Sequence, residues 1–301
     1  MVSKNADNRV SLIAHPTPEI PLLPPSQIPP SAPNYSTYIS ALSNFAIQYN
    51  MSVMGIALIL MDNSAATDLS PAFPRTSSQE SLLKSSVFAG AVVGQAVMGY
   101  AGDAIGRGRA MILTNAFTCV GAVASALGTW GSSGEVYDLL IFYRFILGIG
   151  VGGKYPLAST IRAEGTTEGQ NRGVEVAKGF FWQTPGSIFP YVVAWSLVAI
   201  AGQESAGAAH VDTVELQFRL LFGLGALPSV IVMLLTYLQF KDAPLQKVSN
   251  QNPLRVAAAH PELWRRLVGT SVTWFLYDFV YYGTALSQPE IVQVSVTSLL
   301  S

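Results

Sequence analysis

Charged residues are scarce in this sequence. Asp, Glu, Lys and Arg make up 12% of the 301 residues, 50% are hydrophobic, and the mean hydropathy is +0.37. An ordinary soluble domain carries about twice that share of charge, near 25%. The scarcity therefore argues against a soluble domain and indicates a chain that lies in a membrane.

Cysteine and histidine are almost absent as well. The single cysteine, Cys119, has no partner for a disulfide within the chain, and the three histidines are far apart: His15, His210 and His260. No metal site, no cofactor and no nucleophile–base set typical of an enzyme is therefore expected. The net charge of −1 gives no reason to expect a nucleic-acid partner.

Long apolar runs take the place of these residues. A run of about 20 residues crosses a hydrocarbon core of about 30 Å, and seven runs qualify. They lie near 38–61, 80–101, 110–130, 137–161, 175–201, 217–239 and 267–287. We expect an all-α membrane protein: a six-helix N-terminal bundle, arranged as a 3+3 inverted repeat typical of transporters, and a seventh transmembrane helix.

The segments around these runs divide the chain into domains. They are a proline-rich tail (1–37), the six-helix bundle (38–240), an inter-bundle loop (241–266), the seventh helix (267–287) and a short C-terminal tail (288–301). Lys and Arg concentrate in the first tail and in the connections after the second, fourth and sixth runs. The positive-inside rule then places the N-terminus and the 241–266 loop in the cytoplasm.

A glycine-rich charged turn, GYAGDAIGRGR, follows the second run. Its glycines permit positive φ angles, and its carboxylate and guanidinium groups can bind helix ends and each other. The spacing resembles the loop motif of the major facilitator superfamily, which latches the two halves of those proteins. The matching residues are Gly99, Asp103, Gly106, Arg107 and Arg109, and the resemblance adds Glu164 and Arg172 as a charged pair after the fourth run.

The fourth run continues as YRFILGIGVGGKYPLASTIRAEG. Its glycines superficially suggest a dinucleotide-binding loop, but no strand precedes them. In a membrane helix, small residues at this density allow close contact between helices. With Tyr155 and Pro156, the whole string closely resembles the signature of the phosphate:proton symporter family within the superfamily.

A carboxylate interrupts the seventh run, which reads WFLYDFVYY. Trp274, Asp278 and Tyr282 recur every fourth residue and therefore share one face of a helix. A carboxylate inside a bilayer costs at least about 2.5 kcal/mol, so Asp278 should line a wet or protein-filled cavity. The resemblance implies that these three residues bind phosphate together with Tyr155 and with Gln183 of the fifth run, FFWQTPGSIFPY.

The alternative is that Asp278 only pairs with Lys154 and has a structural role. Lys154 stands before Tyr155 where the family usually carries an acid, and Gln48 stands in the first run where the family usually has an Asp. We expect the Lys154 cation to be satisfied by Asp278 or by the anionic solute. Arg144, the other basic residue inside the fourth run, is assigned with Lys154 and Gln48 to a coupling or charge network.

The resemblance implies alternating-access transport of an inorganic anion, phosphate first, across a bilayer, with protons coupled in the full-length form. It also implies a multi-pass protein of the plasma membrane. The sequence stops after the seventh run, so it resembles a transporter truncated before five further helices. Two alternatives stay open: a non-transporting truncated or regulatory membrane protein, and a superfamily carrier for a sugar or an organic ion.

Overall fold

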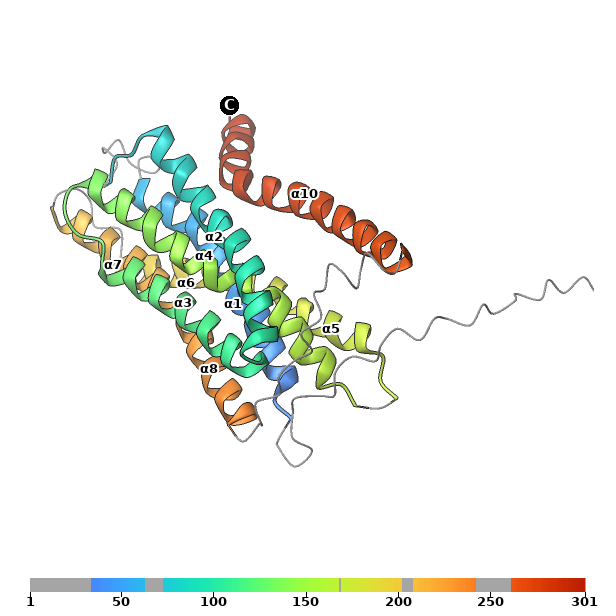
Figure 1. Cartoon of the computed structure of the whole chain (residues 1–301). Coiled ribbons are helices and arrows are strands. Elements are labelled where there is room, and N and C mark those ends of the chain that lie inside the picture. The colour runs from blue at the N-terminus through green and yellow to red at the C-terminus, as the bar shows by residue number, and fades with distance from the viewer. Residues whose placement is uncertain (1–33, 63–72, 168, 202–207, 242–260, 301) are drawn as a thin grey trace, which may run out of the picture.

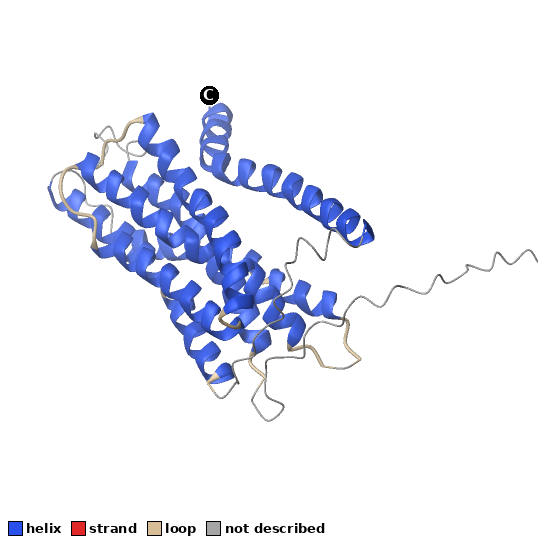
Figure 2. Ribbon diagram, viewed as in Figure 1, coloured by secondary structure: helices blue, strands red, loops and turns tan. Residues whose placement is uncertain are grey.

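The computed structural model describes residues 34–62, 73–167, 169–201, 208–241 and 261–300. These residues form helices with short connections and contain no strand, so the all-α prediction is confirmed for them (Figure 2). The helices are α1 (Ser36–Asp62), α2 (Ser77–Ala104), α3 (Arg107–Leu127), α4 (Ser133–Glu164), α5 (Arg172–Phe181), α6 (Gln183–Ala201), α7 (Ala208–Leu224), α8 (Leu227–Phe240) and α10 (Pro261–Leu300).

Five segments of the described chain are long and apolar enough to cross a membrane. They are Ser36–Asp62, Ser77–Ala104, Arg107–Leu127, Ser133–Glu164 and Asp212–Phe240, the last comprising most of α7 and all of α8. These segments correspond to the first four predicted runs and the sixth, although the third segment ends at Leu127, three residues before the predicted end at 130. The fifth and seventh runs are helical as well, in α5 with α6 and in α10, but these helices fall outside that set.

The C-terminal part differs from its expected bounds. α10 begins at Pro261 and continues to Leu300, whereas the sequence suggested a helix over 267–287 followed by a tail. Apart from Pro289, the stretch after residue 287 contains neither proline nor glycine, so little in it ends a helix. Residues 1–33 of the proline-rich tail and 242–260 of the expected loop lie outside the described residues.

Short polar side chains fix where several helices begin. Thr76 and Gln79 form a capping box at the start of α2, and Asn171 accepts hydrogen bonds from two amides at the start of α5. At the start of α4, the Glu135 carboxylate accepts a hydrogen bond from the Ser132 amide at 2.7 Å. These contacts satisfy amides that would otherwise be unpaired at the first helical turn.

The glycines of α4 allow it to pack closely on α2. A Cβ atom added at Gly148 would meet the Val87 carbonyl oxygen, and one added at Gly152 would meet the Ala91 carbonyl oxygen. The same holds in reverse for Gly90, whose Cβ would meet the Phe145 carbonyl oxygen. The prediction that these glycines serve close helix contact is confirmed, because the two backbones leave no room for side chains between them.

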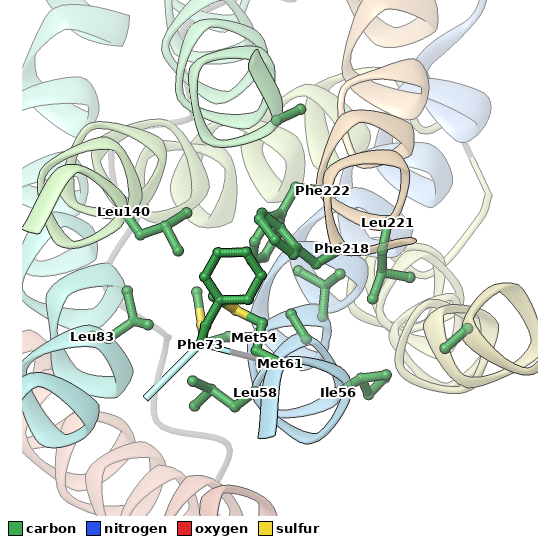
Figure 3. Close-up of a cluster of buried hydrophobic side chains, with 14 of the residues drawn as sticks. Met54, Ile56, Leu58, Met61, Phe73, Leu83, Leu140, Phe218, Leu221 and Phe222 are labelled. Atoms are coloured by element: carbon green, nitrogen blue, oxygen red, sulfur yellow. The ribbon is translucent and has the colours of Figure 1, made fainter. Parts of the chain in front are cut away.

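A cluster of apolar side chains fills the bundle near the C-terminal end of α1 (Figure 3). The Phe73 and Phe218 rings meet edge to face with centroids 5.5 Å apart. Met54, Leu58, Met61, Leu83 and Leu140 surround them. The Tyr137 hydroxyl donates to the Phe73 carbonyl oxygen at 2.9 Å, which ties the segment before α2 to α4.

α10 lies outside the packed helices and touches them along one face only (red in Figure 1). Its aromatic side chains Phe275 and Phe279 are 67% and 74% exposed, on the side away from the bundle. Asp278, Tyr281 and Tyr282 are more shielded, because their side of the helix meets the bundle. The contact face of α10 is therefore the polar one.

Candidate functional site

α4 and α10 meet through two tyrosine hydroxyl groups. The Tyr155 and Tyr282 oxygens lie 2.8 Å apart, a hydrogen bond in which either can be the donor. The Phe88 ring of α2 packs edge to face on the Tyr282 ring, with centroids 5.1 Å apart. A hydroxyl pair leaves lone pairs and one proton available for a further polar group, so this junction can bind a ligand.

Asp278 belongs to the same junction. It lies one helical turn before Tyr282 and close enough to both Tyr155 and Tyr282 to interact with them electrostatically. Its side chain is neither fully buried nor exposed. Trp274, one turn before Asp278, forms a side-chain hydrogen bond with it. The structure thus brings together four of the five residues expected to bind the anion: Tyr155, Trp274, Asp278 and Tyr282.

α1 and α6 approach the junction from a second side. The Gln183 side chain, at the start of α6, donates from Nε2 to Asn44 Oδ1 of α1 at 2.9 Å. The Trp274 ring of α10 packs edge to face on the Phe180 ring of α5, with centroids 5.7 Å apart. Trp274 and Gln183 are therefore placed around the end of α5 and contact neighbours other than the two tyrosines.

Gln48 joins α1 to α10. Its Nε2 donates to the Tyr281 hydroxyl at 3.0 Å, while its buried Oε1 has no hydrogen-bond partner among the described residues. Sequence reasoning missed Tyr281 and Asn44, although both are polar groups within apolar runs and could have been chosen on that signal. Tyr281 and Tyr282 thus hold α10 by hydrogen bonds to α1 and to α4, while Asn44 links α1 to Gln183 of α6.

Lys154 does not face this junction. Its ammonium group is fully buried and donates to the Ser229 hydroxyl of α8 at 2.7 Å. Of the two partners expected for the Lys154 cation, the anionic solute stays a prediction, whereas Asp278 is not the group that Lys154 contacts. The reason is helical geometry: successive residues turn by about 100°, so Lys154 points toward α8 while its neighbour Tyr155 points toward α10.

Arg144 lies deeper in the bundle and is also fully buried. One of its terminal nitrogens donates to the Asn50 carbonyl oxygen of α1, and its guanidinium carbon lies 5.3 Å from the centroid of the Phe222 ring of α7. It therefore does not share a contact with Lys154 or Gln48. The three residues expected to form one charge network are placed in three different environments.

The charged turn forms a cluster at the far end of α2 and α4. The Arg107 guanidinium group donates a hydrogen bond to the Asp103 carboxylate within the charged turn. Its Nε donates to Glu164 Oε1 of α4 at 3.3 Å. Gly106 has a φ of 92°, which favours glycine and lets the chain reverse between α2 and α3. The motif residue Gly99 is half-buried, whereas Arg109 and Arg172 are exposed.

A buried ion pair stands next to this cluster and was not foreseen. Arg162 of α4 pairs with Glu175 of α5, and both side chains are 8% exposed. Lys178, 65% exposed, binds the other oxygen of Glu175 at 2.6 Å. Glu175 therefore connects α4 to α5. The charged pair expected of Glu164 and Arg172 is a separate one, and Arg172 lies close enough to Glu164 to interact with it electrostatically.

The chain resembles transporters of known family. The model of the family described as "Sugar (and other) transporter" matches residues 36–244. Inorganic phosphate transporter PT2 of Toxoplasma gondii is 35% identical over 86% of this chain and 44% of its own length. Low affinity inorganic phosphate transporter 4 of Lotus japonicus is 29% identical over 67% of this chain and 46% of its own length.

Solved structures show the same fold. The inward-open xylose transporter XylE from E. coli superposes with a TM-score of 0.58 over 85% of this chain and 63% of that protein, at 20% identity. A second structure, of the major facilitator superfamily proton:xylose symporter XylE bound to 6-bromo-6-deoxy-D-glucose, superposes with a TM-score of 0.55 over 67% of this chain and 43% of that protein, at 21% identity.

The chain spans less than half the length of the two phosphate transporters. The family match nevertheless covers most of this chain, and its helices share the arrangement of the transporter structures. The chain is thus an integral, multi-pass membrane protein that belongs to the sugar (and other) transporter family of the major facilitator superfamily.

Proposed function

We propose that this chain forms one half of an inorganic phosphate transporter and contributes a phosphate site where α4 meets α10. The observation that carries the proposal is the 2.8 Å contact between Tyr155 and Tyr282, with Asp278 beside it. Hydroxyl and indole groups donate hydrogen bonds to anion oxygens, and a protonated carboxyl group can donate as well. Similarity to named phosphate transporters supports the choice of anion.

The site comprises Tyr155, Gln183, Trp274, Asp278 and Tyr282. Phosphate between α4 and α10 would separate the two tyrosine hydroxyls and accept a hydrogen bond from each. Gln183 and Trp274, around the end of α5, would close the site from the α1 side as α10 moves. The site therefore depends on α10 changing its distance from the bundle.

The proposal extends to the helix arrangement, the orientation in the membrane, the cytoplasmic gate and the proton coupling. The residues up to Phe240 form the six-helix bundle, α10 is the seventh helix, and five further helices of a full transporter would complete the cavity. The N-terminus is cytoplasmic and the membrane is the plasma membrane. The turn with Asp103, Arg107 and Glu164 gates the cytoplasmic side, and protons are coupled through Asp278, since Lys154 and Gln48 supply no carboxylate.

Equilibrium binding of labelled phosphate to the purified chain tests the proposal. We expect saturable binding that excess unlabelled phosphate displaces and excess xylose does not. Sulfate, a tetrahedral anion without a proton to donate at neutral pH, should compete at least ten times more weakly. Saturable binding of labelled xylose by a chain that binds no phosphate would instead support the sugar carrier, and no binding of either would support a non-transporting relative.

A further inference from the structure

Arg144 is a buried cation whose charge no carboxylate balances within the described residues. It is the largest fully buried side chain of the described chain, and it forms no ion pair there. Only one of its nitrogens has a hydrogen-bond partner, the Asn50 carbonyl oxygen. Its Nε and its other terminal nitrogen are buried and have no hydrogen-bond partner in the part of the chain that the structure describes.

Nearby groups leave this charge uncompensated. The Tyr49 hydroxyl donates to the Leu221 carbonyl oxygen, and the Asn50 side-chain nitrogen donates to the Ala46 and Gly225 carbonyl oxygens. The Asn50 Oδ1 atom is buried without a hydrogen-bond partner among the described residues, but a neutral amide oxygen cannot balance the positive charge. The Phe222 ring, 5.3 Å from the guanidinium carbon, offers a cation–π contact. Such a contact stabilises a cation by much less than the burial of a lone charge costs.

Arginine cannot escape this cost by losing its proton. A buried lysine such as Lys154 can become neutral, but a guanidinium group stays charged at any pH that a protein meets. Water could accept hydrogen bonds from the free N–H groups of Arg144, but it would not balance the positive charge. Only an anion both accepts these hydrogen bonds and balances the charge.

We propose that Arg144 binds a small inorganic anion, chloride being the best candidate, inside the bundle between α1, α4 and α7. The surrounding residues Tyr49, Asn50 and Phe222 are at most 1% exposed, which favours an anion that sheds its water easily over a large polyvalent one. This site is distinct from the junction with α10. Arg144 and Tyr155 lie about 16 Å apart along α4, at about 1.5 Å per residue.

A substitution at Asn50 tests most directly whether Arg144 binds an anion. A carboxylate at this position, in Asn50→Asp, would place a fixed negative charge beside the guanidinium group and replace the bound anion. Arg144→Gln removes the cation itself. Lys154→Gln is the matched control, because it removes the other fully buried cation of α4 and leaves Arg144 unchanged.

The experiment measures the thermal unfolding midpoint of the purified full chain in sodium chloride and in sodium gluconate at equal ionic strength. Chloride should raise the midpoint of the wild type and of Lys154→Gln by about 3 °C at saturation, and should leave Asn50→Asp and Arg144→Gln unchanged. Because Asn50→Asp also loses two amide hydrogen bonds, the result is read from the chloride-dependent shift and not from the absolute midpoint.

A second measurement on the wild type alone covers the case in which a variant does not fold. The chloride NMR line should broaden when the protein is added, and an excess of bromide should reverse the broadening. Phosphate at a concentration that fills the α10 junction should not reverse it. No broadening, or a midpoint shift that persists in both Asn50→Asp and Arg144→Gln, overturns the proposal. Loss of chloride broadening on adding phosphate would overturn the claim of a separate site.

Discussion

The hydroxyl oxygens of Tyr155 and Tyr282 lie 2.8 Å apart, although 127 positions separate the two residues in the chain. The contact joins the glycine-rich helix of the bundle to a helix whose opposite face is exposed. α10 therefore has one polar face that contacts the bundle and one aromatic face that is exposed.

Asp278 gives the first prediction. If phosphate binds next to a protonated Asp278, its affinity should fall as the pH rises and the carboxylate ionises, because two negative charges then repel each other. Asp278→Asn should keep an affinity within about tenfold of the wild type at low pH and should lose most of this pH dependence. Phosphate binding measured from pH 5 to pH 8 checks the prediction, and equal pH profiles for the two proteins would refute it.

Lys154 gives the second prediction. Because it contacts Ser229 and not the α10 junction, Lys154→Met should change phosphate affinity by less than about twofold. Replacing a buried charge by an apolar side chain of similar volume is often neutral or stabilising, by about 1 to 4 kcal/mol for buried ion pairs. The unfolding midpoint should accordingly stay level or rise. A tenfold loss of phosphate affinity would return Lys154 to the binding site.

The contrast between Lys154 and Tyr155 shows what the sequence could predict. Four-residue spacing correctly placed Trp274, Asp278 and Tyr282 on the face of α10 that meets the bundle, since that spacing depends only on local helix geometry. Local sequence spacing does not determine which neighbouring helix a given side chain of α4 contacts. Lys154 was therefore given the wrong partner, because its direction depends on how α8 packs.

The same limit explains the pair that sequence reasoning missed. Arg162 and Glu175 meet only because the connection between α4 and α5 folds back on itself. The charged turn was easier to identify, because Asp103 and Arg107 are only four residues apart in the sequence and bond each other across the short reversal between α2 and α3. Local motifs could be predicted from the sequence, whereas contacts across connections could not.

The Arg162–Glu175 pair gives the third prediction. Removing one partner of a buried ion pair costs about 3 to 5 kcal/mol, so Arg162→Gln should lower the thermal midpoint by about 10 °C. Lys178→Gln is the matched control, because Lys178 binds the same carboxylate from an exposed position and should matter by less than about 1 kcal/mol. Equal shifts of the thermal midpoint in the two variants would show that the buried Arg162 stabilises the protein no more than the exposed Lys178.

Transport by the 301-residue chain alone gives the fourth prediction. Alternating access needs two walls around the solute, and among the described helices α10 alone faces the bundle across the proposed site. Liposomes that contain only this chain should therefore show no phosphate uptake above that of empty liposomes. Saturable uptake by these liposomes would show that copies of the chain build the second wall for each other.

The central claim is that phosphate binds between Tyr155 and Tyr282, and a double-mutant cycle tests it most directly. The measurement is the phosphate affinity of the purified wild type, Tyr155→Phe, Tyr282→Phe and the double variant, with Tyr281→Phe as the neighbouring control. We predict that each single change at the site weakens binding about tenfold, that the double change weakens it by less than the product, and that Tyr281→Phe changes it by less than about threefold. Unchanged phosphate affinity in the double variant, with the protein folded, would contradict the account.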